Sequence, residues 1–363
     1  MVLVLSNDEM DRLQDLPMAA IVAAMEDAFR ELGQGVAVNP PRRRLVVPPR
    51  DTDRTYWFNN IMGAVPGSGL MALRIDSAFF RLTREAGGDG PADGAGLRKE
   101  RAGDFVGLVL LFDLETADLV AVLHDHFLST RRVAATSAVG AKYLARPDAR
   151  VLGLFGSGRQ AAQQVPAMAA VRPLELVKVY SPNPEHRREF AARLGQEVGV
   201  EVRAVDDPRA VVAGSDIIAC ATNSRTPVFD GAWLAPGMHV VPIVGTDQSA
   251  AGSEIDATTV RRADVVVANL KEQIAVDRQP KLLPAIEAGA LRWEEIHDLA
   301  EVVAGRAPGR ASPDQITLHD NNTGMGIQFA ALGALILQRA RAQGLGRELP
   351  ADLFATRGGT YAP

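Results

Sequence analysis

A glycine-containing turn in the middle of the chain constrains the fold more strongly than any other feature of the sequence. The segment GSGRQA, residues 156–161, directly follows the apolar run at residues 151–155 and opens a helical pattern. In that context a G-x-G-x-x-A pattern is typical of the first βα unit of a dinucleotide-binding domain. Gly156 permits a tight turn, Gly158 lets the backbone approach a pyrophosphate, and Ala161 lets the helix pack close to the strand. The N-terminus of that helix then offers unpaired N–H groups to a phosphate.

Apolar segments alternate with helical patterns from about residue 130 onward, which predicts a doubly wound parallel sheet. The predicted strands are residues 151–155, 176–180, 200–205, 216–220, 238–244 and 264–268. The predicted helices between them are residues 159–171, 185–198 and 208–213.

The two chain ends have a different pattern, which indicates a second domain of strands and helices. Its expected strands are residues 2–5, 56–62, 70–75, 106–112 and 119–123, the last two forming a hairpin. Its expected first helix has an N-cap at residues 6–9, and apolar residues follow with helical spacing at positions 18 to 29. A long helix at residues 323–344 is expected to return and pack on this part. Residues 84–104 include a glycine-rich stretch and are expected to form a long surface loop that either covers a site or is simply tolerated.

Composition and charge exclude several classes of protein. A net charge of −5 provides no basic surface for nucleic acid, and no stretch approaches the roughly 18 apolar residues of a membrane span. The single cysteine, Cys220, cannot form an internal disulfide and favours a reducing compartment. With no basic, apolar leader at the N-terminus, we expect a cytoplasmic protein. His124 and His126 flank Asp125 and would share a face of a strand, but no third ligand is near, so we expect no metal site.

The end of the second predicted strand bears on the choice of cofactor. Sites for NAD usually carry Asp or Glu at this point to hold the ribose hydroxyls, whereas this chain has Ser181. Asn183, Arg187 and Arg188 follow, and all of these side-chain types can hydrogen-bond a 2′-phosphate. NADP(H) is therefore favoured and NAD(H) stays possible, with solvated helix arginines as the alternative interpretation of Arg187 and Arg188.

Several segments together resemble the ornithine cyclodeaminase/μ-crystallin family. They are residues 132–138, 142–149, 156–158, 221–224, 227–229, 244–247 and 323–328. The family contains ornithine cyclodeaminases, alanine dehydrogenases, ketimine and iminosuccinate reductases and a hormone-binding lens protein, and its members are typically dimers. The resemblance implies an α/β fold with a Rossmann domain at residues 131–319. Residues 1–130 with 320–363 would form an α+β domain for substrate binding and dimerisation.

The resemblance also implies roles for individual residues. Arg132 matches an arginine that holds a substrate carboxylate, and a second one falls within residues 42–44, where the spacing favours Arg44 over Arg42 on the same strand face. Asp247 matches a catalytic aspartate that exchanges a proton at the substrate nitrogen, the alternative being a turn cap. The predicted cofactor-binding residues are Gly156, Gly158, Arg159, Gln160, Ala161, Ser181, Asn183, Arg187, Thr222, Val244 and Gly245.

Two departures from the family pattern bear on the substrate. Arg74 stands where the cyclodeaminases carry a lysine, and because arginine in effect cannot lose its proton, we expect a fixed cation rather than a base. Asn60 stands where those enzymes place an acid for the ornithine amine. Both departures argue against ornithine as the substrate.

These observations predict an oxidoreductase that transfers hydride between a nicotinamide dinucleotide and the C–N bond of a small amino or imino acid. Two alternatives stay open. One is a cyclodeaminase-like lyase that borrows and returns the hydride, and the other is a non-catalytic protein that binds NADPH and a small ligand.

Overall fold

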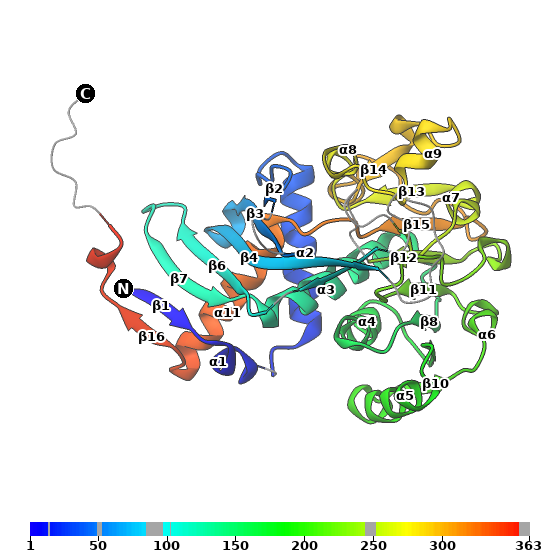
Figure 1. Cartoon of the computed structure of the whole chain (residues 1–363), viewed down its shortest axis with the longest axis horizontal. Coiled ribbons are helices and arrows are strands. Elements are labelled where there is room, and N and C mark those ends of the chain that lie inside the picture. The colour runs from blue at the N-terminus through cyan, green and yellow to red at the C-terminus, as the bar shows by residue number, and fades with distance from the viewer. Residues whose placement is uncertain (14, 49–52, 85–96, 102, 244–251, 356–363) are drawn as a thin grey trace.

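The computed structural model describes residues 1–13, 15–48, 53–84, 97–101, 103–243 and 252–355. Within these residues the chain forms two eight-stranded sheets that lie side by side along the long axis of the molecule (Figure 1). No described helix is long and apolar enough to cross a membrane.

The second sheet along the chain is wholly parallel and confirms the predicted doubly wound fold. Its strand order is β10-β9-β8-β11-β12-β15-β13-β14. The strands are β8 (Val151–Phe155), β9 (Leu176–Tyr180), β10 (Glu201–Ala204), β11 (Ile217–Cys220), β12 (His239–Pro242), β13 (Val265–Ala268), β14 (Ile296–Asp298) and β15 (Thr317–Asp320). The helices of this part are α4 (Arg159–Ala169), α5 (Pro184–Val198), α6 (Pro208–Val212), α7 (Ala257–Arg262), α8 (Glu272–Asp277), α9 (Leu283–Glu287) and α10 (Leu299–Val303).

The sequence did not predict β14 or β15, although all six predicted strands are present. β15 enters the sheet between β12 and β13 and carries Thr317, His319 and Asp320, all of them buried. Because β15 contains several polar residues, it lacks the apolar pattern that predicts a buried strand.

The first sheet is mixed, with the order β16-β1-β7-β6-β4-β3-β2 and β5 paired to β4. Its strands are β1 (Val2–Leu5), β2 (Arg43–Val47), β3 (Thr55–Val65), β4 (Leu70–Arg84), β5 (Leu97–Arg101), β6 (Val106–Asp113), β7 (Leu119–His124) and β16 (Arg347–Leu349). The predicted hairpin is confirmed as β6 and β7. Part of the predicted loop at residues 84–104 is instead the strand β5, since residues 97–101 pair with β4, and most of the rest lies outside the described residues.

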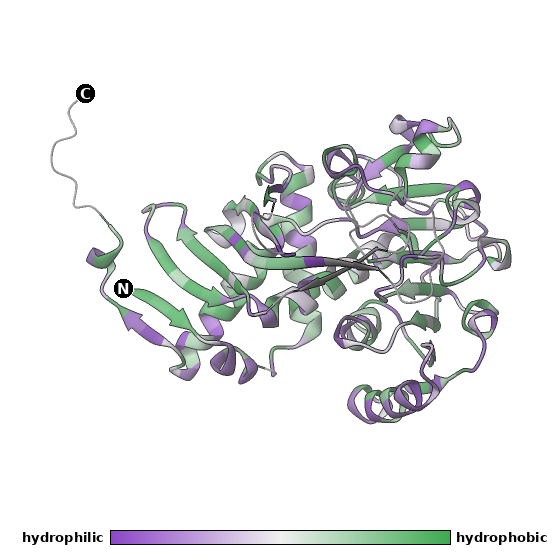
Figure 2. Ribbon diagram, viewed as in Figure 1, coloured by the Kyte–Doolittle hydropathy of each residue, from purple (hydrophilic) through white to green (hydrophobic). Residues whose placement is uncertain are grey.

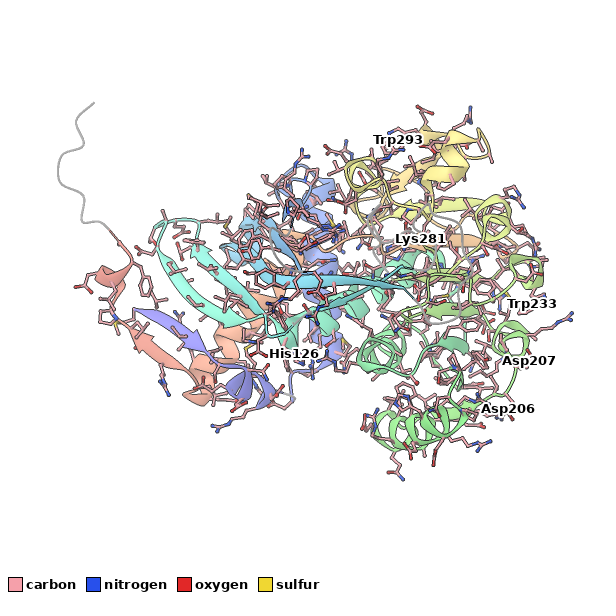
Figure 3. All side chains as sticks on the ribbon, viewed as in Figure 1. His126, Asp206, Asp207, Trp233, Lys281 and Trp293 are labelled. Carbon is pink, nitrogen blue, oxygen red and sulfur yellow. The ribbon has the colours of Figure 1, made fainter. Side chains whose placement is uncertain are left out.

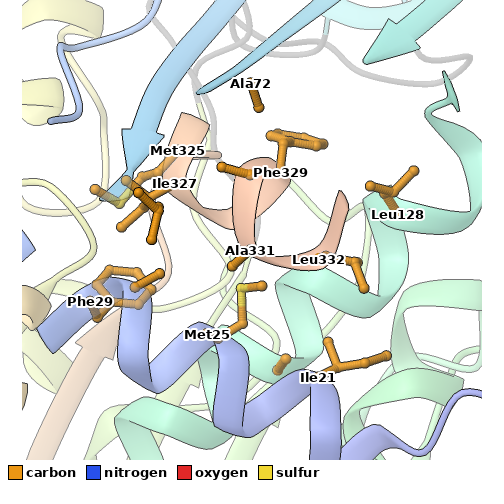
Figure 4. Close-up of a cluster of buried hydrophobic side chains, with 14 of the residues drawn as sticks. Ile21, Met25, Phe29, Ala72, Leu128, Met325, Ile327, Phe329, Ala331 and Leu332 are labelled. Atoms are coloured by element: carbon orange, nitrogen blue, oxygen red, sulfur yellow. The ribbon is translucent and has the colours of Figure 1, made fainter. Parts of the chain in front are cut away.

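Helices cover one face of the first sheet and bury its core. They are α2 (Met18–Gly33), α3 (His126–Leu144) and α11 (Gly326–Gln343), and the short α1 (Asn7–Asp11) precedes them. The predicted return of the C-terminal helix is confirmed, because α11 packs on β3, β4 and α2. Met25 of α2 lies beside Ala331 of α11 and Phe29 lies near Ile327, whereas Phe329 lies on the side of α11 toward Ala72 of the sheet (Figure 4). Figure 2 shows that β1, β6 and β7 are mostly hydrophobic, whereas the outer helix α5 is mostly hydrophilic.

The helix α3, which joins the two sheets, was not predicted. β7 ends at His124 and α3 starts at His126, so the two histidines do not share one strand. α3 packs on both α2 and α4 and connects the first sheet to β8. The domain boundaries near residues 130 and 320 stay predictions.

Candidate active site at the junction of the two sheets

The turn between β8 and α4 has the geometry that dinucleotide binding requires. Gly156 has φ +106°, and a Cβ there would stand 2.3 Å from the Ala221 carbonyl oxygen, so only glycine fits. Its N–H donates to the Tyr180 carbonyl oxygen at 2.8 Å, which fixes the turn against β9. Among the residues that the structure describes, none lies within 4 Å of a Cβ built on Gly158, and no side chain caps the start of α4. The helix N-terminus is therefore open to an anion.

A cavity of about 930 Å³ runs beside this turn and contains residues from both sheets. It brings together most of the predicted cofactor residues: Gly156, Gly158, Arg159, Gln160, Ser181, Asn183 and Thr222. Ala161 is fully buried behind the turn, in the packing role expected of it. Arg74 of β4 and Asp125, which follows β7, line the same cavity. Val244, Gly245 and Asp247 lie outside the described residues.

Hydroxyl and imidazole groups surround the end of β9. The Ser157 hydroxyl donates to the Ser181 hydroxyl at 3.0 Å and lies 3.2 Å from Nδ1 of His186. The Asn183 side chain accepts the His186 N–H at 3.0 Å and caps α5. Among the described residues that line the cavity, Asp125 is the one acid, and it is paired with Arg74.

Arg187 does not lie where the sequence suggested. It is absent from the described cavity lining, and its buried guanidinium donates to the Ser181 carbonyl oxygen at 2.9 Å and pairs with Asp206. It also lies 5.4 Å from the ring centroid of Tyr180. The prediction that Arg187 presents its charge to the ribose is wrong, because α5 turns this side chain behind the loop, where it supports Ser181.

Thr222 is held by a buried carboxylate that the sequence reasoning missed. The backbone N–H and the hydroxyl of Thr222 each donate to Oε1 of Glu254 at 2.7 Å. Glu254 is fully buried and also accepts the Ile243 N–H at 3.3 Å. It thereby joins the loops that follow β11 and β12 at the carboxyl edge of the sheet. An acid within the segment GSEID carries no local signal of this role.

Arg132 is positioned by a hydrogen-bonded glutamine. Its Nη1 donates to Oε1 of Gln328 at 3.1 Å, and Nε2 of Gln328 donates to the Thr136 hydroxyl at 2.8 Å. Its guanidinium lies 5.3 Å from the ring centroid of Phe329. Burial, together with the nearby Arg74, lowers the pKa of Arg132 to about 9. Its Nε is buried and has no partner among the described residues, so this arginine has a donor available for an anion.

Arg44 and Asn59 form the next part of the site. Nε of Arg44 donates to Oδ1 of Asn59 at 2.8 Å, and the two residues pair directly between β2 and β3. Burial and the neighbouring Arg42 lower the pKa of Arg44 to about 10.

The register of the strands corrects the prediction for Asn60. Asn59 pairs with Arg44 on one side and with Asp76 on the other, whereas Asn60 pairs with Arg43 and Ile75. Because strand side chains alternate between faces, Asn60 points away from Arg44 and Arg74. The asparagine on the face of the arginines is Asn59, one position earlier.

Arg74 links the cavity to these arginines. Its Nε donates to Oδ2 of Asp125 at 2.6 Å, and its Nη2 lies 3.4 Å from Oδ2 of Asp76. Asp125 is the N-cap residue of α3, and Ser129 and Arg132 follow it at spacings of four and three residues, so the three side chains face the same way. Arg74 therefore lines the same cavity as the glycine turn and lies within electrostatic range of Arg132, and its role toward the substrate stays a prediction.

His126 and Arg159 meet where the two sheets adjoin. Nη1 of Arg159 contacts the His126 ring, 3.2 Å from Nδ1, and burial together with this arginine lowers the pKa of His126. Figure 3 shows His126 between the first sheet and the helices of the second. No group of three potential metal ligands occurs among the residues that the structure describes.

Comparisons with known proteins agree with this arrangement. The chain is 35% identical over 331 residues to a putative dehydrogenase of Rhizobium meliloti, covering 90% of this chain and 92% of the relative. The Δ1-pyrroline-2-carboxylate reductase of Thermococcus litoralis, solved with NADH and L-proline, superposes with a TM-score of 0.79 at 28% identity, covering 96% of this chain and all of that one. The iminosuccinate reductase of Paracoccus denitrificans, solved with NAD+, gives a TM-score of 0.78 at 27% identity, with 96% and 99% coverage. The ornithine cyclodeaminase/mu-crystallin family model matches residues 99–344, and the chain belongs to that family.

Proposed function

We propose that this protein is an NAD(P)-dependent oxidoreductase that reduces the C=N bond of a small imino acid, or oxidises the corresponding amino acid. The observation that carries the proposal is the continuity of the cavity, which joins the open N-terminus of α4 to Arg74 of the first sheet. Such continuity would allow a reducible carbon to lie beside a dinucleotide. The two related reductases named above act on cyclic or acyclic imino acids of this kind.

Each proposed site residue has a role that follows from the chemistry of its side chain. Guanidinium groups bind carboxylates in two-point contacts, so Arg132 and Arg44 are proposed to hold the α-carboxylate. Arg74 supplies a fixed positive charge for a further polar or anionic group of the substrate. Asp247 stays our candidate for exchanging the proton at nitrogen, on the strength of the sequence resemblance. A bound nicotinamide dinucleotide supplies the hydride, and the protein supplies orientation and electrostatics.

The test is NADPH oxidation, followed by absorbance, with ammonium or methylamine and pyruvate, glyoxylate or oxaloacetate. Arg132→Lys should reduce kcat/KM by about 10- to 100-fold, because a lysine cannot reproduce a two-point contact. Arg131→Lys is the matched control, the same change one position earlier on α3. Absence of turnover with every acid, despite tight NADPH binding, would contradict the proposal, and ammonia release from diamino acids without net oxidation would favour the lyase.

For the cofactor, we propose a preference for NADP(H). Support comes from Ser157, Ser181 and His186, which offer neutral or cationic partners for a 2′-phosphate near the end of β9. Ser181→Asp should invert the ratio of kcat/KM for NADPH over NADH, because the carboxylate repels the phosphate and binds ribose hydroxyls. An unchanged ratio would argue against a phosphate site there.

For the assembly, we propose a homodimer formed through the uncovered face of the first sheet. Five apolar side chains on this face are 39–52% exposed: Leu45, Val47, Met62, Phe79 and Val106. The strand register places them on the face opposite α11. An exposed apolar patch of this kind is typical of a protein interface. Phe79→Asp should convert a dimer to a monomer in light scattering, and a wild-type monomer would contradict the proposal.

For the location, we propose the cytoplasm. Cys220 is buried and is the only cysteine in the chain, which fits a reducing compartment.

A further inference from the structure

The helix α8 reaches from the second sheet to strand β2, where the proposed substrate arginine lies. Gln273 is fully buried, and its Oε1 accepts the Arg42 N–H at 2.8 Å while its Nε2 donates to the Arg42 carbonyl oxygen at 3.4 Å. Both hydrogen-bonding groups of the Arg42 backbone are thus held by one side chain. Arg42 therefore has a fixed position beside Arg44.

One turn further along α8, Asp277 engages the guanidinium of Arg42. Its Oδ2 accepts from Nε at 3.1 Å and from Nη2 at 2.5 Å, and both side chains are about nine-tenths buried, with exposures of 11% and 8%. The same oxygen lies 3.9 Å from Nη2 of Arg44. Asp277 is therefore primarily the counter-ion of Arg42 and a more distant neighbour of Arg44.

Arg42 stands within electrostatic range of both proposed substrate arginines. Its charge contributes to lowering the pKa of Arg44, and it acts in the same direction on Arg132. Among the described residues, Asp277 pairs with Arg42, and Arg44 and Arg132 lie within electrostatic range of it. Without Asp277, three guanidinium groups would compete for one substrate carboxylate.

We propose that Asp277 is a positioning residue that occupies Arg42 and so directs the substrate carboxylate to Arg44 and Arg132. The inference rests on the proposed function, because it concerns recognition of the imino-acid carboxylate. It predicts that loss of the Asp277 charge creates a new anion site at Arg42, since a buried cation without its counter-ion is strongly unfavourable.

The first experiment measures this anion site directly, with acetate as the probe. Thermal unfolding of Asp277→Asn is followed against acetate concentration and compared with the wild type. We expect acetate to bind the variant about tenfold more tightly, which appears as a larger rise in Tm at each concentration. Asp15→Asn is the matched control, since it removes the partner of Arg339 at the surface. In Arg42→Gln/Asp277→Asn, which lacks both charges, acetate affinity should return to the wild-type value.

Steady-state kinetics give a second readout that a merely structural role would not produce. A substrate that also binds through Arg42 in a non-reacting pose lowers kcat and KM of Asp277→Asn by the same factor and leaves kcat/KM unchanged. General damage to the site would lower kcat/KM instead, and this outcome would overturn the proposal.

Two acetate results would also overturn it. One is equal acetate affinity in Asp277→Asn and the wild type, and the other is raised affinity that persists in the double variant. If Asp277→Asn does not fold, the double variant must fold and bind acetate as the wild type does, and its failure to do so refutes the inference. The acetate assay needs no turnover, so a wild type inactive on every imino acid counts against the proposed function alone.

Discussion

Replacing Gly158 by alanine should separate dinucleotide binding from folding. The backbone at this position has φ −91° and ψ −174°, which alanine adopts without strain, and its Cβ would meet no atom of the described residues within 4 Å. The unfolded chain would become slightly less flexible, so stability should be unchanged or about 0.4–1 kcal/mol higher. The added methyl group would nevertheless stand in the cavity, where the pyrophosphate is expected to approach the backbone.

The expected loss of affinity follows from the contacts that the methyl group would displace. A hydrogen bond between a backbone N–H and a charged phosphate contributes about 1.5–3 kcal/mol. Losing one such bond corresponds to a roughly 10- to 150-fold increase in the Kd for NADPH. Gly156→Ala should instead lose stability as well as binding, because its Cβ would collide with the Ala221 carbonyl oxygen.

Thermal unfolding with and without NADPH measures both quantities at once. At a concentration about 100 times the wild-type Kd, NADPH should stabilise the wild type by about 2.7 kcal/mol, and a tenfold weaker variant by about 1.4 kcal/mol. Gly195→Ala on α5 is the matched control, since its Cβ would lie 3.7 Å or more from its neighbours, an ordinary contact distance. Undiminished NADPH binding by Gly158→Ala would show that the pyrophosphate does not approach this turn, and the reasoning would fail.

Four further predictions follow from the contacts of single residues. Gln328→Ala should lower kcat/KM about tenfold by releasing Arg132, and urea unfolding should show a loss of about 1–3 kcal/mol, because the Met325 N–H loses its acceptor and the Thr136 hydroxyl loses a donor; unchanged kinetics would contradict the positioning of Arg132. Arg74→Lys should release no ammonia from ornithine in a glutamate-dehydrogenase-coupled assay, since Asp125 and Asp76 would keep the ammonium charged. Burial lowers the pKa of His319 to about 3, so neutral His319 stabilises the fold fully above pH 6.5. As pH falls from 6.5 toward 3, the free energy of unfolding should decrease by about 1.4 kcal/mol per pH unit. His319→Gln should reduce this pH dependence, measured by urea unfolding. Burial raises the pKa of Asp298 to about 6, so stability is lost as pH rises from 3.8 to 6, and Asp298→Asn should gain about 1–3 kcal/mol over the wild type at pH 7 but little at pH 4.

Features that depend on a few adjacent residues were predictable from the sequence. The glycine turn is set by local backbone requirements, and Gly156 and Gly158 have the conformation and the open approach that the pattern demands. The six apolar strands of the second sheet follow from their β-branched composition, since buried parallel strands are apolar on both faces. Ser181 and Asn183 reach the cavity because they directly follow β9.

Features that depend on packing between distant segments were not predictable. Asn60 and Asn59 differ by one position, and only the pairing of β3 with β2 and β4 decides which of them faces the arginines. Arg187 looked available in the sequence, but its position on α5 and the contact with Asp206 turn it away from the cavity. Glu254 accepts a hydrogen bond from Thr222, which lies 32 residues earlier in the chain, and no pattern in the sequence predicts such a contact.

The surroundings of Arg74 favour a reductase over a lyase. Deamination requires a side chain that accepts a proton or activates water near the substrate nitrogen. Arg74, which stands where the cyclodeaminases carry a lysine, is an arginine held by Asp125 at 2.6 Å and lies 3.4 Å from Asp76. An arginine that is paired with carboxylates serves as a fixed cation and not as a base. A fixed cation can, however, hold an anionic group of the substrate while hydride reaches the neighbouring carbon. Reduction of an imino acid requires no base at the position of Arg74.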